Sequence, residues 1–290
     1  MAERKRRGGG RSARQAERQK PKTQTAPYIK RNIPVYNLLN EEGLSLIENN
    51  ADTILQEIGI DFRGDPEALE ILKDAGADVK EERVRFPKGM CQSLIRDTAP
   101  KEFIQHARNP ERNVVIGGEN LVLVPAYGSP FIRNVEEGRR YATIEDFRNF
   151  VKLAYLSPEL HHSGGTICEP VDLPVNKRHF DMVYTHMRYS DKPFMGSVTA
   201  PERAEDTVEM AKILFGADFI DNNTVITSLI NANSPMVWDS TMLGAMKAYS
   251  RNNQAVVVSP FCISGAMSPV TVAATSSQLY AEALSGMAFA

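Results

Sequence analysis

Five short apolar runs recur at nearly equal spacing through the second half of the sequence, and this rhythm restricts the fold more than any other feature. The runs begin near residues 121, 160, 193, 224 and 254, at separations of 39, 33, 31 and 30 residues. Each run ends in small polar residues and precedes a stretch with helical spacing, and one strand with its crossover helix occupies about this length. The sequence therefore predicts an α/β fold with a parallel sheet, of the TIM-type (β/α)8 barrel class.

The number of repeats predicts only part of such a barrel. A closed eight-unit barrel occupies typically ~250 residues, whereas residues 119–290 hold about five units. The last unit has the run 255–258, the turn Ser259-Pro260-Phe261 and a helical pattern that still continues at Ala290. We therefore expect the front part of a longer barrel protein, with roughly 100 residues of it outside this sequence. A half-barrel that closes against a second copy, as a homo-oligomer, is the alternative.

Two regions precede the predicted barrel. Residues 1–26 are polar and carry nine Lys or Arg against two Glu, so we expect a disordered basic tail. Residues 27–118 mix helical patterns with short strands and are predicted to form an α+β cap packed on the barrel. Asn40 and Asp65 stand where helix N-caps are expected, and Gly59 and Gly76 where those helices end.

Composition excludes several functional classes. The chain is 42% hydrophobic and 24% charged, and it contains no apolar run of the ~18 residues that a membrane span requires. Three widely separated cysteines without a CxxC pair indicate a reducing, cytoplasmic location. We do not expect nucleic acid as a partner, because no aromatic residue is interleaved with the basic residues of the tail.

Candidate site residues follow from the barrel prediction, because βα loops converge at the carboxyl ends of the strands. The side chains placed there are mainly hydroxyl, amide and aromatic groups. The principal candidates are Tyr127, His162, Glu169, Asn231, Asn233 and Phe261, with Thr199, Ser234 and Ser259 nearby. None of them is a strong candidate for acid or base chemistry, and we assign no catalytic residue.

Three common chemistries lack the residues they need. Lys192 precedes its strand, which is the wrong end for a Schiff-base lysine. Neither GxGxxG nor a Walker loop occurs, so no nucleotide fingerprint is present. His161, His162 and Cys168 form the only group resembling a zinc site, and adjacent histidines on a strand point to opposite faces, so we expect no bound metal.

The remaining candidates suit a cationic ligand that is bound without proton transfer. Tyr127 and Phe261 offer the aromatic faces that quaternary ammonium groups prefer. Glu169 is expected to balance the positive charge, and Asn231 and Asn233 to orient the ligand.

Several segments resemble the trimethylamine methyltransferase family. At the strand ends they are His162-Ser163-Gly164-Gly165, Asn231-Ala232-Asn233-Ser234-Pro235 and Ser259-Pro260-Phe261. The closing stretch 278–286, the entry Tyr36-Asn37-Leu38-Leu39 and the helix end Glu57-Ile58-Gly59-Ile60 resemble it as well. The likeness covers most of residues 28–290 and is spread along the chain rather than concentrated in one motif.

The resemblance implies a TIM-barrel methyltransferase that moves a methyl group from a methylated amine to the cobalt of a corrinoid (cobalamin) carried by a separate protein. The corrinoid protein and a small methylated amine are then the partners, and this chain itself binds no cofactor. Some family members use trimethylamine and contain pyrrolysine, which would lie beyond Ala290, and others act on quaternary amines such as glycine betaine. The basic tail looks more like the branch without pyrrolysine. A fragment with five units is expected to be inactive alone.

Two other functions remain open from the residues alone. One is a zinc-assisted methyltransferase or barrel lyase that depends on His162 or Cys168. The other is a non-catalytic binding protein for quaternary amines.

Overall fold

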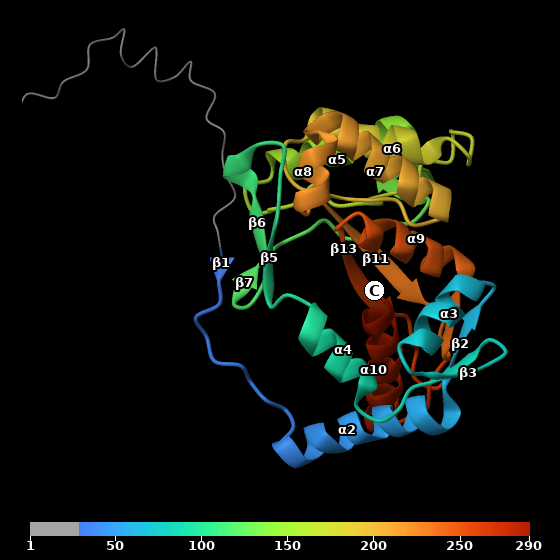
Figure 1. Ribbon diagram of the computed structural model, residues 1–290. Helices are drawn as coiled ribbons and strands as arrows, with labels where there is room; N and C mark the ends of the chain where they lie inside the picture. The colour runs from blue at the N-terminus through green and yellow to red at the C-terminus, as the bar shows by residue number, and fades with distance from the viewer. Residues whose placement is uncertain (1–28) are drawn as a thin grey trace, which may run out of the picture.

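A three-stranded parallel sheet lies at the centre of the computed structural model, which describes residues 29–290 (Figure 1). Its strands are β10 (Phe194–Met195), β11 (Ile226–Ala232) and β13 (Ala255–Pro260), in the order β10-β11-β13. Phe194 pairs with Ile226, and Leu229 pairs with Val257. Three of the five predicted runs are therefore parallel neighbours in chain order. The predicted disordered tail lies outside the described residues.

The first two predicted strands are extended segments rather than regular strands. The His161 N–H donates to the Leu123 carbonyl at 3.0 Å, and the Ser163 N–H donates to the Pro193 carbonyl at 2.8 Å. These bonds place the segments beside β10 in the expected order. The prediction of strands over 121–126 and 160–166 is wrong, because only β7 (Asn120–Leu121) falls in the first run and it pairs antiparallel with β1 (Ile29–Lys30). Gly164, with φ +87°, interrupts the second run.

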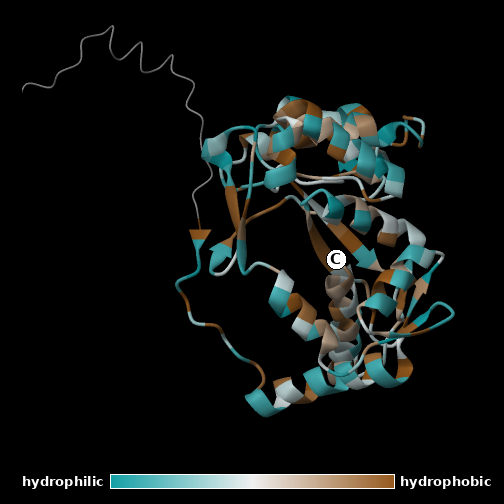
Figure 2. Cartoon of the chain, viewed as in Figure 1, coloured by the Kyte–Doolittle hydropathy of each residue, from teal (hydrophilic) through white to brown (hydrophobic). Residues whose placement is uncertain are grey.

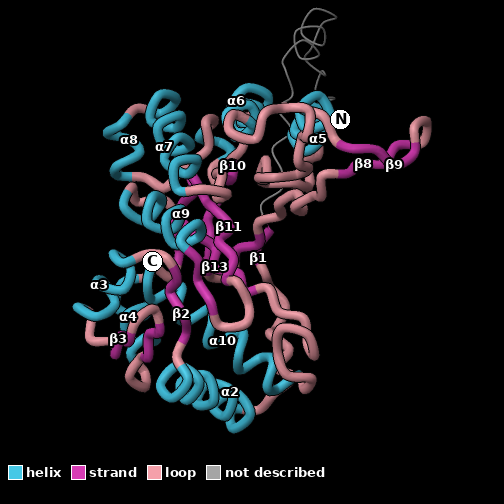
Figure 3. Tube along the Cα trace, turned by 90° about the vertical axis from the view of Figure 1, so that its right-hand side faces the viewer, coloured by secondary structure: helices cyan, strands magenta, loops and turns pink. Residues whose placement is uncertain are grey.

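We call the sheet β10-β11-β13, together with the two extended segments beside β10, the wall. Helices cover one of its faces. They are α5 (Ile144–Leu156), α6 (Arg178–Tyr189), α7 (Pro201–Phe215), α8 (Ala217–Asn222), α9 (Ser240–Arg251) and α10 (Val272–Phe289). Figure 3 shows α7, α8 and α9 on one side of β11 and β13. The sequence predicts Thr143 as the N-cap of the helix at this position; the structure confirms that cap and adds a capping box with Asp146 at the start of α5. Within residues 29–290 the wall does not close into a barrel.

The amino-terminal region contains the predicted mixture of helices and short strands. Its helices are α2 (Glu41–Thr53), continued by the π-helical turn η1 (Ile54–Ile58), α3 (Pro66–Asp74) and α4 (Met90–Thr98). Asn40 and Asp65 accept backbone N–H bonds at the starts of α2 and α3, so both predicted N-caps are confirmed. The predicted boundaries at residues 26 and 118 stay predictions.

One strand pairing joins this region to the wall. β12 (Val237–Asp239) pairs parallel with β2 (Ile60–Arg63), in a sheet with β4 (Arg83–Arg85) and β3 (Asp78–Lys80). The helical spacing after the apolar run near residue 224 predicts a helix from residue 236. This start is wrong, because residues 237–239 form β12 before α9 begins. The strand that follows β11 thus completes the sheet of the cap, which is separate from the three-stranded sheet β10-β11-β13.

Two antiparallel hairpins complete the described fold. β5 (Glu102–Gln105) and β6 (Val114–Gly117) enclose the short 3-10 helix η2 (Pro110–Arg112). β8 (Phe131–Asn134) and β9 (Gly138–Tyr141) form a second hairpin between the first segment of the wall and α5, and the sequence analysis did not anticipate it.

The main apolar core lies between the wall, its helices and the cap. Trp238, Tyr249, Phe62, Ile226 and Leu243 are fully buried there. Figure 2 shows β6 and β13 as mainly apolar strands. Among residues 29–290, no helix combines the length and the apolar composition that crossing a membrane would require.

Candidate functional site

Side chains of β11 alternate between the helix layer and the opposite face of the wall. Ile226 and Ile230 belong to the core that includes Leu243 and Tyr249 of α9, so they face the helices. Leu229 and Asn231 consequently point to the opposite, inner face. Their partners on β13 are Val257 and Ser259, and paired residues of parallel strands share a face. The inner face is accessible, since Val257 is 43% exposed.

Tyr127 lies over the same inner face. A Cβ atom added to Gly165 would lie 2.6 Å from the Tyr127 hydroxyl oxygen and 3.0 Å from Met195 Cβ. Met195 pairs with Thr227 of β11, which shares its face with Leu229 and Asn231. The missing side chain at Gly165 thus leaves the space that the Tyr127 hydroxyl occupies. Burial raises the pKa of Tyr127 to about 12, so the phenol stays neutral.

The structure places Asn231 and Ser259 side by side in the β11–β13 register near the carboxyl ends of their strands. Phe261 follows β13 by one residue and is 64% exposed. The Asn233 side-chain amide donates to Asp239 Oδ2 at 2.8 Å, so this residue also stabilises the turn between β11 and β12. The loops after β11 and β13 thus begin side by side at one edge of the sheet, and the substrate roles of their residues stay predictions.

Glu169 already has a cationic partner. Its carboxylate forms an ion pair with Arg178, the first residue of α6, and its backbone N–H donates to the Ser129 carbonyl at 3.3 Å. A substrate cation would have to compete with this guanidinium. The geometry therefore gives the predicted charge-balancing role of Glu169 little support.

His162 lies at the opposite end of the wall from the strand-end loops. Its Nδ1 accepts the Gly164 N–H at 2.9 Å, and its Nε2 lies 3.2 Å from Gln105 Oε1. The Gln105 amide also donates to the carbonyls of Phe194 and Val225, both at 3.0 Å, which stand at the amino-terminal ends of β10 and β11. The expectation that His162 shares a location with Asn231 is therefore wrong.

Burial keeps His162 and its neighbour His186 neutral. Burial, with a smaller contribution from His186, lowers the pKa of His162 to about 3, and burial lowers the pKa of His186 to about 4. The His186 Nε2–H donates to the Gly165 carbonyl at 2.9 Å, and its Nδ1 accepts the Ser163 hydroxyl at 2.7 Å. Both rings hold backbone in place beneath the inner face.

No metal centre is formed by the described residues. Between residues 29 and 290, no three His, Cys, Asp or Glu side chains are grouped so that they could hold a metal ion. Burial raises the pKa of the Cys168 thiol to about 12, which disfavours the thiolate that zinc binds. The alternative zinc chemistry based on His162 or Cys168 thus lacks a ligand set in this part of the chain.

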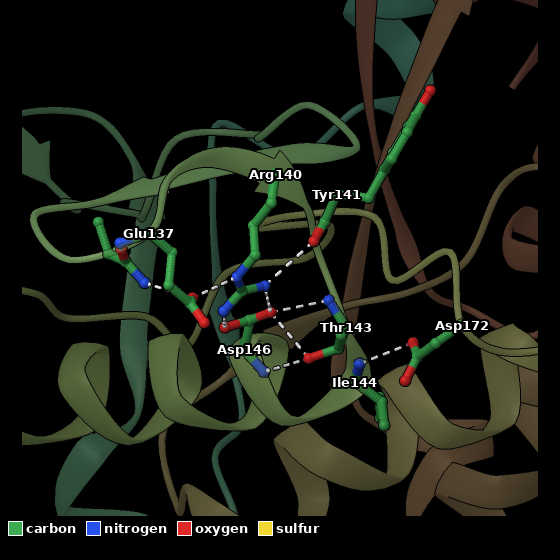
Figure 4. Close-up of polar contacts among 8 residues, drawn as sticks. Glu137, Arg140, Tyr141, Thr143, Ile144, Asp146 and Asp172 are labelled. Atoms are coloured by element: carbon green, nitrogen blue, oxygen red, sulfur yellow. Dashed lines mark hydrogen bonds and ion pairs between the residues drawn. The ribbon is translucent and has the colours of Figure 1, made fainter.

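A polar network fixes the β8–β9 hairpin to the start of α5 (Figure 4). Arg140 donates to both oxygens of Asp146 at 2.7 and 2.9 Å, and to Glu137 at 2.6 Å. The Arg140 hydrogen bonds, more than the Thr143 contacts, lower the pKa of Asp146 to about 2. The Ile144 N–H donates to Asp172 at 2.9 Å, which ties the loop after the second segment to the same helix end. This network thus fixes the β8–β9 hairpin, which follows Tyr127 in the chain, against α5.

Sequence reasoning missed some residues that shape the site. Gly165 and Met195 form the surface under Tyr127, and Arg178 neutralises Glu169. Glu282, a buried carboxylate on α10, contacts the loops after β11 and β13. Glu282 is the only charged residue in α10, and this is the sequence signal that points to it.

The fold and this surface define a wall of β/α units whose strand-end loops present aromatic, amide and hydroxyl groups to an open inner face. The chain belongs to the trimethylamine methyltransferase (MTTB) family, whose profile matches residues 7–290. The resemblance seen in the sequence is thereby confirmed.

Comparison with characterised proteins gives one close relative. The chain is 45% identical over 259 residues to a glycine betaine methyltransferase of Desulfitobacterium hafniense (strain Y51), covering 89% of this chain. It spans about half of that relative, 54% of its length. Among solved structures, the monomethylamine methyltransferase of Methanosarcina barkeri is similar with a TM-score of 0.40 and 14% identity, covering 76% of this chain and 52% of that one. A hydroxylamine complex of the same methyltransferase gives the same values.

Proposed function

We propose that this chain is the front part of a methyltransferase that demethylates glycine betaine. The single observation that carries the proposal is the 45% identity to a glycine betaine methyltransferase across 89% of the chain. The proposed methyl acceptor is the reduced cobalt of a corrinoid on a separate protein, which supplies the electron pair for the new bond to carbon. Because the chain spans 54% of the length of that relative, "the complete protein" below means a protein of the relative's full length.

The chemistry of a quaternary amine agrees with the side chains on the inner face. Its nitrogen has neither a proton nor a lone pair, so a methyl group leaves by displacement at carbon. The C–N bond breaks, its electrons stay on nitrogen, and a neutral tertiary amine departs. The protein therefore has to orient the C–N bond and exclude water, and it needs no acid at the leaving group.

The described residues support this division of roles. Tyr127 presents a neutral aromatic ring for the trimethylammonium group. The Asn231 amide and the Ser259 hydroxyl, adjacent in the sheet, are donors suited to the carboxylate of glycine betaine. Phe261 is proposed as a second aromatic face. We also propose a cytoplasmic location, where a reduced corrinoid can be maintained.

The test uses the complete protein with reduced corrinoid protein and either glycine betaine or trimethylamine. We expect corrinoid methylation, followed by visible absorbance, and an equal amount of dimethylglycine with glycine betaine only. Methylation with trimethylamine alone would assign the other substrate. Binding of glycine betaine by calorimetry without any methylation would identify a binding protein and refute the proposal.

Two substitutions at one position test the cation contact. Tyr127→Phe keeps the ring and is the matched control, and we expect it to retain kcat/KM within about threefold. Tyr127→Leu removes the π-face, and we expect kcat/KM for glycine betaine to fall at least fivefold, since a cation–π contact contributes roughly 1–2 kcal/mol. Equal effects of the two substitutions would contradict the role of the ring.

A further inference from the structure

Helix α10 carries a carboxylate in the interior of the protein. Glu282 is fully buried, with Gln278 one turn before it and Ser285 one turn after it on the same face. Moving an ionised carboxylate out of water is costly unless hydrogen bonds or a cation compensate. Among residues 29–290, no Lys, Arg or His forms an ion pair with Glu282, so hydrogen bonds must hold it.

Four donors surround the two carboxylate oxygens. Oε2 accepts the Ser234 hydroxyl at 2.5 Å, and Oε1 accepts the Met236 N–H and the Gln278 amide, both at 2.9 Å. The Cys262 thiol lies 3.7 and 3.8 Å from the two oxygens. An acceptor-only group with two oxygens matches this ring of donors.

Three of the four donors come from two different loops of the candidate site, and the fourth, Gln278, lies on α10 itself. Ser234 and Met236 belong to the loop between β11 and β12, and Cys262 follows β13. Gln278 extends the connection, since its amide also donates to the Met267 carbonyl at 2.9 Å, farther along the second loop. One side chain of the helix layer thus joins the loops that carry Asn233 and Phe261.

The backbone at Met236 requires this support. Met236 has φ +54°, a left-handed conformation that is unfavourable for a residue with a long side chain. Its N–H is held by Glu282 and its carbonyl accepts the Asp61 N–H at 3.1 Å. Loss of the carboxylate would release one of the two bonds that hold this conformation.

We propose that Glu282 is a positioning residue for methyl transfer, fixing the loops after β11 and β13 at the mouth of the substrate site. The inference rests on the proposed function for its catalytic consequence, whereas the loop connection is measurable without substrate. Glu282 itself touches no substrate in this assignment and acts through Ser234, Met236 and Cys262.

The experiment compares Glu282→Gln with a control on the same helix. The glutamine has nearly the same shape, but its NH2 group is a hydrogen-bond donor and replaces one of the two accepting oxygens, so it faces groups that also donate. Ser285→Ala is the control. The Ser285 hydroxyl accepts the Trp238 indole N–H at 3.1 Å and donates to the Glu282 backbone carbonyl, so its hydrogen bonds reach neither of the two loops. Amide hydrogen exchange is measured first, without substrate, at the Met236, Gly265 and Met267 N–H groups.

We expect exchange at these amides to accelerate at least about tenfold in Glu282→Gln and to stay unchanged in Ser285→Ala. Unchanged exchange in Glu282→Gln, or equal acceleration in both variants, would overturn the inference. This measurement is independent of the proposed function, which fails separately if the unmodified complete protein methylates no corrinoid.

Kinetics then test the positioning role in the complete protein. In Glu282→Gln we expect kcat for glycine betaine demethylation to fall at least about tenfold, while Ser285→Ala keeps kcat within twofold at a comparable loss of thermal stability. A loss of kcat that scales only with stability in both variants would show a merely structural role and refute the assignment.

Discussion

Acidification should destabilise this protein through two buried neutral histidines. The pKa of His162 is about 3 and that of His186 is about 4 in the folded state, against 6.5 in an unfolded chain. Between pH 6.5 and pH 4 the unfolded state therefore binds protons that the folded state does not. Stability is fully present above about pH 6.5 and declines as the pH falls toward the folded pKa values.

The size of the loss follows from the same values. At pH 5.0 each histidine lies 1.5 units below its unfolded pKa of 6.5 and still above its folded pKa. At about 1.4 kcal/mol per unit, each contributes a loss of about 2 kcal/mol, or about 4 kcal/mol for both. This is a large share of the ~5–15 kcal/mol that stabilises a typical domain. Asp146, with a pKa of about 2, titrates below this window.

The assay is urea unfolding at pH 7.5, 6.5, 5.5 and 5.0, followed by circular dichroism. His186→Asn removes one of the two groups, and we expect its free energy of unfolding to fall about 2 kcal/mol less than that of the unmodified protein over this range. The other histidines are common to both proteins and cancel in the comparison. A free energy of unfolding that is constant from pH 7.5 to 5.0, or that has the same slope in the variant, would refute the reasoning.

Three substitutions test further contacts. Gly165→Ala would place a methyl group 2.6 Å from the Tyr127 hydroxyl, so we expect Tyr127 to shift and glycine betaine affinity to fall in calorimetry of the complete protein, with little change in melting temperature. Gly286→Ala would bring a Cβ within 2.3 Å of the buried Trp238 ring, and urea unfolding should show a loss of about 1–3 kcal/mol; no loss would contradict this close approach. Lys192→Met would remove the ammonium that donates to three carbonyls in the last turn of α5 and the loop after it, those of Ala154, Ser157 and Leu160, at 2.7 to 3.0 Å. We expect at least about 2 kcal/mol of destabilisation and faster hydrogen exchange at the end of α5, and unchanged exchange would refute this role.

Local signals predicted the elements that depend on local chemistry. The β-branched run 255–258 became β13, and Thr143, Asn40 and Asp65 cap helices where expected. Strands that depend on partners far along the chain were not predictable. β12 exists because residues 237–239 pair with β2, and nothing in the Val-Trp-Asp sequence distinguishes it from a first helical turn.

The same distinction between local and tertiary signals applies to the residues of the candidate site. The positions of Asn231 and Ser259 follow from strand periodicity, because each stands at the carboxyl end of an apolar run. The position of His162 does not, since its partner Gln105 comes from a hairpin 57 residues earlier in the chain. Glu282 was missed because three of its four donors come from two loops that only the tertiary fold brings together.

Because β2 pairs with β12, a strand of the cap has to wait during synthesis for a partner that is made much later. Asp61 leaves the ribosome long before its partner Val237, and at translation rates of about 5–20 residues per second the interval is roughly ten to forty seconds. During that time one edge of β2 has no parallel neighbour from this chain. A nascent protein with an uncovered edge is open to wrong pairing, so chaperone contact would matter most in this interval.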